Sequence, residues 1–223
     1  MVADILKRKG GGKVIVLDAN NDIQAEKHTF SNAFNRLYGD IIEYHTNISI
    51  DAVDSDNKVV YTNIGEFQAD VLNIIPKQKA SAFLVQTGLT DLGDWAPIDL
   101  TTYESTLYGF ENVHIIGDAQ ATKQPKSAHM ANSQAKICAD AVLRSLFNLP
   151  TDDDERLDNI TTNSACYSPI TYDEASWLTA NFSYDKDNDK MKLMNIGEAQ
   201  KWNQENFKQM FNWANNLFVD SFY

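Results

Sequence analysis

The residues most able to do chemistry lie in one stretch, from His114 to Lys136, which reads HIIGDAQATKQPKSAHMANSQAK. An apolar run ends there at Gly117-Asp118, a proline-containing loop follows, and a helix is predicted to begin near Ser127. A glycine permits a sharp turn at the end of a strand, where open α/β sheets bind ligands, and Asp118 can accept hydrogen bonds from a ligand hydroxyl. The alternative is that the Gly-Asp pair only turns the chain.

The predicted helix would add a second feature to this site. Its first backbone N–H groups and the positive end of its dipole favour a ligand with negative charge, such as the anionic edge of a reduced flavin. Lys126 can add positive charge there, although a lysine at a helix start is also typical of a solvated surface. Asn132, Ser133 and Gln134 are either polar contacts to a ligand or one exposed helical turn.

The two cysteines have different surroundings. Cys166 lies among Asn163, Ser164 and Ser168, an exposed polar setting that is compatible with thiol exchange but also with an idle loop thiol. Cys138 falls on the apolar face of the predicted helix and is interpreted as a small buried hydrophobic residue. Neither the two cysteines nor the four histidines show the spacing of a metal site, so no metal is predicted.

Composition excludes several classes of protein. A chain of 223 residues with 43% hydrophobic residues can bury a sizeable core. No apolar run approaches the roughly 18 residues needed to cross a bilayer, so no membrane span is expected. The net charge of -12 argues against a nucleic-acid partner, which would require clustered basic residues.

Hydrophobic periodicity predicts an α/β fold that begins in mid-unit, because a helix feeds the first buried strand and no strand precedes that helix. Asp18, at the end of that strand, is similar to an acid that holds a nicotinamide ribose, but the glycine-rich turn that such a site needs is absent, so a structural role is favoured. The predicted strands are 14–18, 70–76 and 112–118, a strand meander is predicted within 41–75, and helices are predicted at 2–9, 26–38, 77–90, 127–147 and near the C-terminus.

A longer motif identifies a family. The stretch NVHIIGDAQATKQPKSAHMANSQAKICADAV resembles the late flavin-binding motif of flavocytochrome c sulfide dehydrogenase flavoprotein subunits, in which a strand and GDA precede a loop, P-K-S and A-N-S-Q-[GA]-K. KVIVLDANNDI, ADVLNIIPKQKA and GLTDLGDWAPIDLTTYESTL are similar in order and spacing to the middle of that family, and NSACYS resembles its T-C-Y-S entry to the C-terminal flavin-binding region. The resemblance covers nearly the whole chain but only about the later half of a family member, whose G-x-G-x-x-G fingerprint has no counterpart here.

This resemblance implies a FAD-dependent oxidoreductase. In the family, sulfide attacks a redox disulfide whose second cysteine matches Cys166, electrons pass to FAD, and a cytochrome c subunit takes them away. A periplasmic location and no turnover by the isolated chain are also expected. FAD is expected in the full-length protein, and its absence from this chain alone is left open. The implied cofactor contacts are Gly117, Asp118, Ala119, Lys126, Ser127, Asn132 and Ser133.

The expected architecture is an incomplete two-dinucleotide-binding-domain flavoprotein with a small α+β C-terminal region. Residues 1–75 would be the remainder of the second, NAD-like domain, 76–150 the late part of the FAD-binding domain, and 151–223 a C-terminal region on the flavin, substrate and interface side. Sheet edges left exposed would be covered by self-association, for example in a homodimer. The alternatives are a fragment of a sulfide:quinone reductase-like flavoenzyme and a non-catalytic interaction module that has lost its cofactor.

Overall fold

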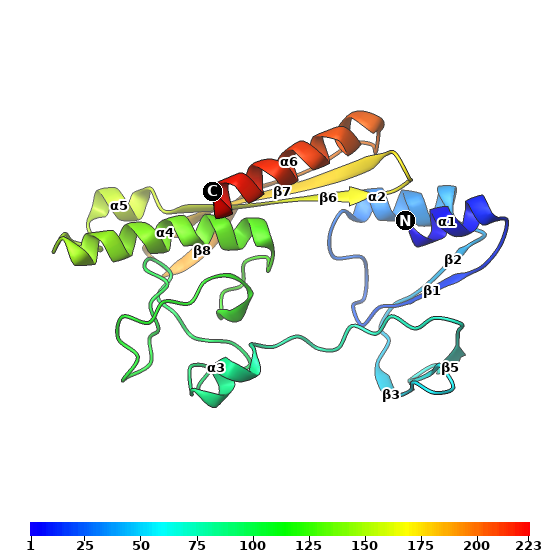
Figure 1. Ribbon diagram of the computed structural model, residues 1–223, viewed down its shortest axis with the longest axis horizontal. Coiled ribbons are helices and arrows are strands. Elements are labelled where there is room, and N and C mark those ends of the chain that lie inside the picture. Colours follow the sequence, from blue (N-terminus) through cyan, green and yellow to red (C-terminus); the bar gives the residue numbers. More distant parts are fainter. The chain divides into compact units, whose positions relative to one another are not determined.

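The computed structural model describes residues 1–223 and is a mixed α/β fold with three small sheets and six α-helices (Figure 1). The α/β class predicted from the hydrophobic pattern is therefore confirmed. The chain divides into two compact units. Unit 1 comprises residues 1–77, 167–177 and 199–208, and unit 2 comprises residues 78–166, 178–198 and 209–223.

Unit 1 contains two of the sheets. Strand β1 (Val14–Leu17) pairs in parallel with β2 (Ile42–His45). The strands β3 (Ile50–Asp54), β4 (Val59–Thr62) and β5 (Gly65–Gln68) form an antiparallel sheet in that order. The predicted meander is thus found in residues 50–68, whereas β2, which also falls in the predicted meander, belongs to the parallel sheet.

The helices of unit 1 agree with the sequence pattern. Helix α1 (Val2–Lys9) ends at Gly10, whose φ of 83° lies in the left-handed region that glycine tolerates best. Helix α2 (Lys27–Asn32) continues without a break into the π-helical turn η1 (Ala33–Leu37), as predicted for residues 26–38. The core of this unit consists of buried Ala3, Ala33, Tyr38 and Ile170, with Val14, Phe30, Phe34, Leu37, Ile41, Ile42 and Trp202 packed against them.

Two predicted strands are not formed. Residues 70–76 are not part of a strand, and within them Val71 is 82% and Ile75 is 76% exposed. In the second case a single bridge joins Glu104 to His114, after which the chain enters the 3₁₀ turn η2 (Gly117–Ala119). A continuous apolar run indicates a strand buried between neighbours, but the strand forms only where a neighbour is present to exchange hydrogen bonds.

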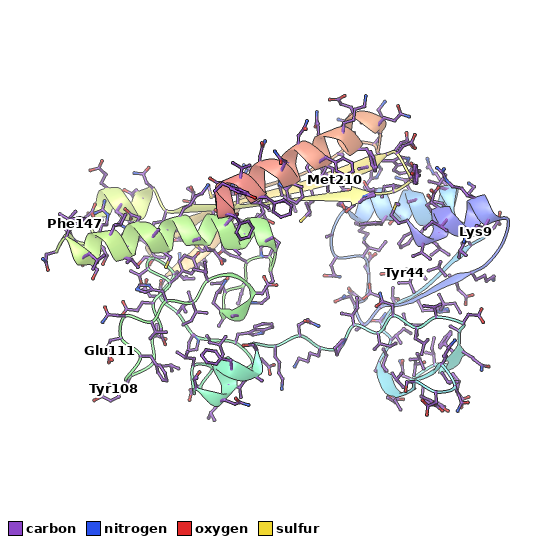
Figure 2. The ribbon with its side chains drawn as sticks, viewed as in Figure 1. Lys9, Tyr44, Tyr108, Glu111, Phe147 and Met210 are labelled. Carbon is purple, nitrogen blue, oxygen red and sulfur yellow. The ribbon has the colours of Figure 1, made fainter.

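Unit 2 has one long helix among irregular loops. Helix α4 (Ala128–Leu146) confirms the prediction for 127–147, whereas the helix predicted over 77–90 is reduced to α3 (Ala82–Gln86). A small core of Leu89, Ala96 and Ile115 supports the loops around η2. Figure 2 shows Tyr108 projecting from one of these loops and Phe147 from the end of α4.

The C-terminal part is α+β, as expected. Helix α5 (Asp154–Asp158) is followed by the strands β6 (Thr161–Pro169), β7 (Ala175–Asp185) and β8 (Lys190–Glu198), which form a sheet in that order. Helix α6 (Gln204–Phe222) ends the chain. None of the helices combines the length and hydropathy that crossing a bilayer requires.

Candidate functional site

The turn before Asp118 is held against helix α4. Gly117 has φ of 72°, and its backbone N–H donates a hydrogen bond to Gln134 Oε1 at 2.8 Å. A Cβ atom at Gly117 would lie 3.2 Å from Ala131 Cβ, which is closer than most real contacts of this kind. Both the left-handed backbone and the close approach of the helix therefore favour glycine here.

A buried chain of amides continues from this turn to strand β6. A backbone N–H can only donate, so Gln134 presents its Oε1 to Gly117 and its Nε2 to Gln124 Oε1, at 3.4 Å. Gln124 Nε2 then donates to the hydroxyl of Thr162. All three side chains are buried, and Gln134 is completely so. The network thus joins the Gly117 turn to β6 without using a charged group.

Asp118 and Ala119 lie directly after this turn. The Asp118 residue is exposed, so its carboxylate is accessible to a ligand. Ala119 is half-buried, and its carbonyl oxygen accepts a hydrogen bond from the N–H of Ala96 at 3.0 Å. Ala119 therefore anchors the turn, while Asp118 is the residue of the pair that faces solvent.

Lys126 bends back over the same turn. Its Nζ donates to the carbonyl oxygens of Asp118 at 2.8 Å and Gln120 at 2.7 Å, and it lies 3.9 Å from the centroid of the Trp95 ring. Partial burial lowers the pKa of Lys126, while the negative charge of Asp118 acts in the opposite direction. Lys126 thus brings a cation to the Asp118 turn.

Ser127 begins helix α4 as its N-cap. The Ser127 hydroxyl accepts a hydrogen bond from the N–H of Met130 at 3.2 Å and lies 3.0 Å from Ser164 Oγ on β6. An N-cap satisfies one of the backbone donors at a helix start and leaves others available to a ligand. The first turn of α4 is therefore fixed to β6 through the same residue that caps it.

Asn132 and Ser133 contact neighbouring elements. Asn132 Nδ2 donates to Ser221 Oγ on α6 at 3.0 Å, and Ser133 Oγ accepts from the N–H of Asn163 on β6 at 3.1 Å. The structure therefore brings Gly117, Asp118 and Lys126 together, whereas Asn132 and Ser133 make contacts one turn further along α4.

Cys166 lies on strand β6 and is a free, half-buried thiol. Side chains two residues apart on a strand share one face, so Thr162, Ser164 and Cys166 point the same way. Thr162 contacts Gln124 and Ser164 contacts Ser127. Cys166 is thus on the face of β6 that is turned toward the start of α4.

The other cysteine, Cys138, is half-buried on α4. Burial raises the pKa of its thiol, which disfavours the reactive thiolate. This agrees with the interpretation of Cys138 as a packing residue. No group of cysteine, histidine and acidic side chains in the structure is arranged to hold a metal ion.

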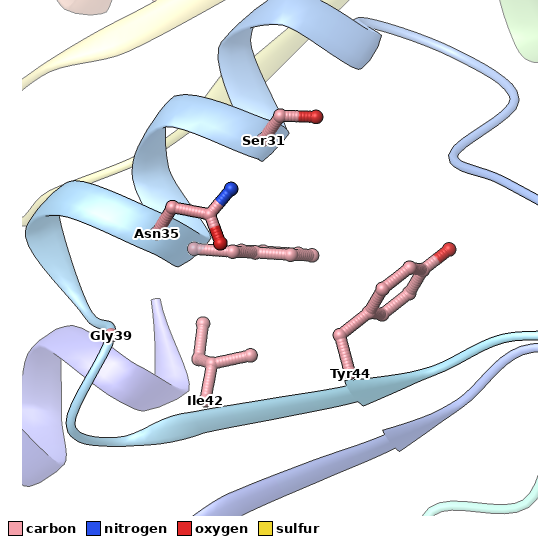
Figure 3. Close-up of a pocket in the computed structure, with 6 residues that line it drawn as sticks. Ser31, Asn35, Gly39, Ile42 and Tyr44 are labelled. Atoms are coloured by element: carbon pink, nitrogen blue, oxygen red, sulfur yellow. The ribbon is translucent and has the colours of Figure 1, made fainter.

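Unit 1 has a separate cavity of about 350 Å³, lined by Ser31, Phe34, Asn35, Gly39, Ile42 and Tyr44 (Figure 3). At its rim, the Tyr44 hydroxyl donates to Asp18 at 2.6 Å. This hydrogen bond is the main cause that lowers the pKa of Asp18. The pKa of Tyr44 is raised to about 12, mainly by burial and next by its hydrogen bond to Asp18. Asp18 also accepts from the N–H of Asn20, so its carboxylate has a structural role in this unit.

The residues near the Gly117 turn fit part of a flavin nucleotide. A carboxylate suits a polyol hydroxyl, and a cation beside the start of a helix suits a negatively charged ring edge. Sequence reasoning missed Trp95 and Gln124. Trp95 lies 31 positions before Lys126 in the sequence and meets the site only through the fold. Gln124 lies within the motif, but its partners Gln134 and Thr162 are 10 and 38 residues away.

Comparison with protein families gives a match for the first part of the chain. Residues 1–76 match the family model described as the sulfide dehydrogenase [flavocytochrome c] flavoprotein chain, central. The resemblance to this family predicted from the sequence is confirmed for these residues, which are 76 of the 223 in the chain.

The solved structures that match this chain have low sequence identity. One chain of the Tetrahymena thermophila mitochondrial ATP synthase has a TM-score of 0.54 at 17% identity and covers 73% of this chain and 39% of its own length. A pyridine nucleotide-disulfide family oxidoreductase from Enterococcus faecalis has a TM-score of 0.47 at 14% identity, with coverage of 98% and 57%. The reduced CoADR-RHD of Bacillus anthracis has a TM-score of 0.48 at 14% identity and covers 97% of this chain and 44% of its own length. This chain therefore spans less than two thirds of each of these proteins.

Proposed function

We propose that this chain is the C-terminal portion of a FAD-dependent sulfide dehydrogenase, which passes electrons from sulfide through a redox disulfide and FAD to a cytochrome c subunit in the periplasm. The match of residues 1–76 to the central region of that flavoprotein family is the observation that supports it. In the proposed arrangement, residues 1–75 are the remainder of an NAD-like domain, 76–150 the late FAD-binding domain, and 151–223 a C-terminal interface region.

The residues of the Gly117 turn and of the start of α4 would contact different parts of the cofactor. Asp118 would accept a hydrogen bond from a flavin side-chain hydroxyl, and Gly117 and Ala119 would let the backbone approach closely. The first N–H groups of α4, capped by Ser127, would face the anionic edge of the reduced ring. Lys126 would add a positive charge, and Asn132 and Ser133 would hold the next helical turn in place.

Cys166 would supply one sulfur of the redox disulfide. Sulfide would attack the disulfide, so that a new sulfur–sulfur bond forms and one cysteine leaves as a thiolate. The chemistry that FAD would supply, when bound, is acceptance of the two electrons that become available as the persulfide and the thiolate re-form the disulfide and the sulfur leaves at the oxidation level of elemental sulfur with loss of a proton. These electrons would then go one at a time to the cytochrome. Because the chain spans only part of its relatives, we expect no sulfide turnover by these 223 residues alone.

A first experiment tests cofactor binding by the chain itself. FAD is titrated into the purified chain while its visible spectrum and the quenching of flavin fluorescence are followed. We expect Asp118→Asn to weaken FAD binding about tenfold, the loss associated with a charge-assisted hydrogen bond. Asp187→Asn, an exposed acid in the β7–β8 turn, is the matched control and should leave the affinity unchanged. Equal affinity of the two variants would contradict the role of Asp118. If the chain alone takes up no FAD, the same two variants are compared in the complete protein.

A second experiment tests the reaction in the complete protein expressed from the reading frame that contains this chain. Cytochrome c reduction is measured with and without sulfide. Cys166→Ser should abolish sulfide-dependent reduction but leave FAD bound, and Cys138→Ser should preserve both. Unchanged turnover in Cys166→Ser would rule out the proposed disulfide, and reduction of a quinone instead of cytochrome c would favour the sulfide:quinone reductase alternative.

A further inference from the structure

The ammonium group of Lys126 is used almost entirely within the protein. An ammonium has three N–H donors. Two of them are directed to the carbonyl oxygens of Asp118 and Gln120, at 2.8 and 2.7 Å, and the ring of Trp95 lies 3.9 Å away. Although Lys126 is exposed as a residue, its charged end is therefore surrounded by two carbonyls and an aromatic face.

These contacts close a loop. Asp118 and Gln120 lie eight and six residues before Lys126, so the two hydrogen bonds tie the end of the loop to its beginning. Gln120 is itself buried, and its side-chain oxygen accepts from the N–H of Thr122 at 2.6 Å, which fixes the middle of the loop. The segment 118–126 is thereby held at both ends and at its centre.

Trp95 makes this arrangement specific for a cation. The face of an indole ring carries partial negative charge and attracts an ammonium group, and more strongly where water is partly excluded. Ala96, next to Trp95, forms a parallel bridge with Gln120, so the ring comes from a segment that is itself fixed to the turn. A methionine at position 126 would lose both the hydrogen bonds and this attraction.

We propose that Trp95 and Lys126 are positioning residues that hold the 118–126 loop in one conformation, so that the carboxylate of Asp118 is presented to a flavin nucleotide. This rests on the proposed function for the identity of the ligand. Lys126 then acts through the backbone of Asp118, and Trp95 is an additional determinant of the site that the sequence motif does not contain.

The test uses two independent measurements on the purified chain. Hydrogen exchange of the amides in residues 118–126, followed by mass spectrometry without added nucleotide, reports whether the loop is held. Titration with FAD reports whether holding the loop matters for binding. The variants are Lys126→Met, which removes the charge, Lys126→Arg, which keeps it, Trp95→Leu, which removes the ring, and Trp95→Phe, which keeps a ring. Lys123→Met, an exposed lysine in the same loop, is the matched control.

We expect Lys126→Met and Trp95→Leu to accelerate exchange in the loop and to weaken FAD binding by about tenfold, within the range of a partly buried cation–π contact. Lys126→Arg and Trp95→Phe should keep most of the protection from exchange and most of the FAD affinity. Arginine also stacks on aromatic rings, and phenylalanine retains a weaker ring face. Lys123→Met should change neither. This rescue by conservative variants is not expected if positions 95 and 126 only fill space.

Three outcomes would overturn the proposal. Weaker FAD binding with unchanged exchange would mean that Lys126 contacts the ligand directly and does not position Asp118. Faster exchange with unchanged FAD affinity would mean that Lys126 and Trp95 hold the loop but that this has no effect on FAD binding. Unchanged exchange and affinity in Trp95→Leu would exclude the ring. If the unmodified chain binds no FAD, the same variants are compared in the complete protein. Failure of that protein to bind FAD would refute the proposed function and not the loop contact, which exchange tests separately.

Discussion

Tyr103 carries a buried hydroxyl group that forms no hydrogen bond. Its side chain is completely buried, and its hydroxyl has no hydrogen-bond partner in the structure. Burial is the main cause that raises the pKa of Tyr103, and nearby Cys138 adds to the shift. A buried hydroxyl without a partner costs free energy that the same ring without the hydroxyl would not lose.

This predicts an unusual result for Tyr103→Phe. Replacing a buried, well-packed side chain usually destabilises a protein, but here we expect the free energy of unfolding to stay the same or rise by about 1 kcal/mol. Urea denaturation followed by circular dichroism measures this. Cys138→Ala, which removes the neighbouring thiol, serves for comparison. A loss of stability greater than about 1 kcal/mol in Tyr103→Phe would show that the hydroxyl has a partner, such as an ordered water.

Gly117 gives the opposite prediction. Gly117→Ala forces a side chain into a left-handed backbone with φ of 72° and places its Cβ against Ala131. We expect a loss of about 1–2 kcal/mol in the free energy of unfolding. Gly11→Ala is the matched control, because a Cβ there would meet nothing within 4 Å and its φ is not in the left-handed region. Equal stability of the two variants would mean that the turn can relax away from α4.

At the residue scale, local signals were predictive and distant contacts were not. The turn at Gly117 could be predicted because a Gly-Asp pair that follows an apolar run indicates a turn at the end of that run. The partners that hold it could not, since Gln134 reaches Gly117 over 17 residues and Trp95 reaches Lys126 over 31. Nothing in the types of these residues indicates which ones meet, and only the folded chain brings them together.

At the scale of elements, three contacts join α4 to α6 along one stripe of α4. His129 Nδ1 accepts from Trp213 Nε1 at 3.0 Å, Asn132 donates to Ser221, and Lys136 forms an ion pair with Asp220 at 2.7 Å. His129 must be neutral to accept this hydrogen bond. Burial is the main cause that lowers the pKa of His129, and Lys136 acts in the same direction, whereas Asn163 and Asp220 raise it.

The attachment of α6 should therefore weaken in acid. The folded-state pKa of His129 lies below its value in the unfolded chain, so its contribution to stability is present above about pH 6.5 and is lost as the pH falls through the folded-state value. We expect the natural chain to lose more stability between pH 7.5 and pH 5 than His129→Gln, which keeps an acceptor but does not titrate. Urea denaturation at both pH values measures the difference, and the other three histidines contribute equally to both proteins. An equal loss in the two proteins would exclude His129 as the cause.

The elements also show why helices were predicted better than strands. Helices α1 and α4, and α2 together with η1, form within a few residues of their predicted bounds, because each backbone hydrogen bond of a helix is made within the segment. A strand makes its hydrogen bonds to another segment, and the apolar run at 70–76 has no strand beside it in the structure. The apolar pattern of residues 70–76 indicates side chains that favour burial, but it does not indicate which segment would cover them.

At the scale of the whole molecule, exposed apolar side chains coexist with a large negative charge. Val71 and Ile75 are mostly exposed in an extended segment with no strand partner, and the net charge is -12. Exposed apolar side chains that lie close together favour contact with another chain. Like charges on two copies oppose that pairing, but salt screens the repulsion, with a Debye length of about 30 Å at 0.01 M and about 3 Å at 1 M.

Self-association of this chain should consequently increase with salt. We expect sedimentation velocity to show a mainly monomeric chain at low ionic strength and a growing dimer fraction at high ionic strength. The double variant Val71→Ser and Ile75→Ser, which keeps the charge but removes both apolar side chains, should remain monomeric under the same conditions. Ionic contacts between copies would be weakened by salt, so a dimer that dissociates as salt rises would assign the interface to charged residues. Salt-promoted dimers that persist in the double variant would place the interface elsewhere in the chain.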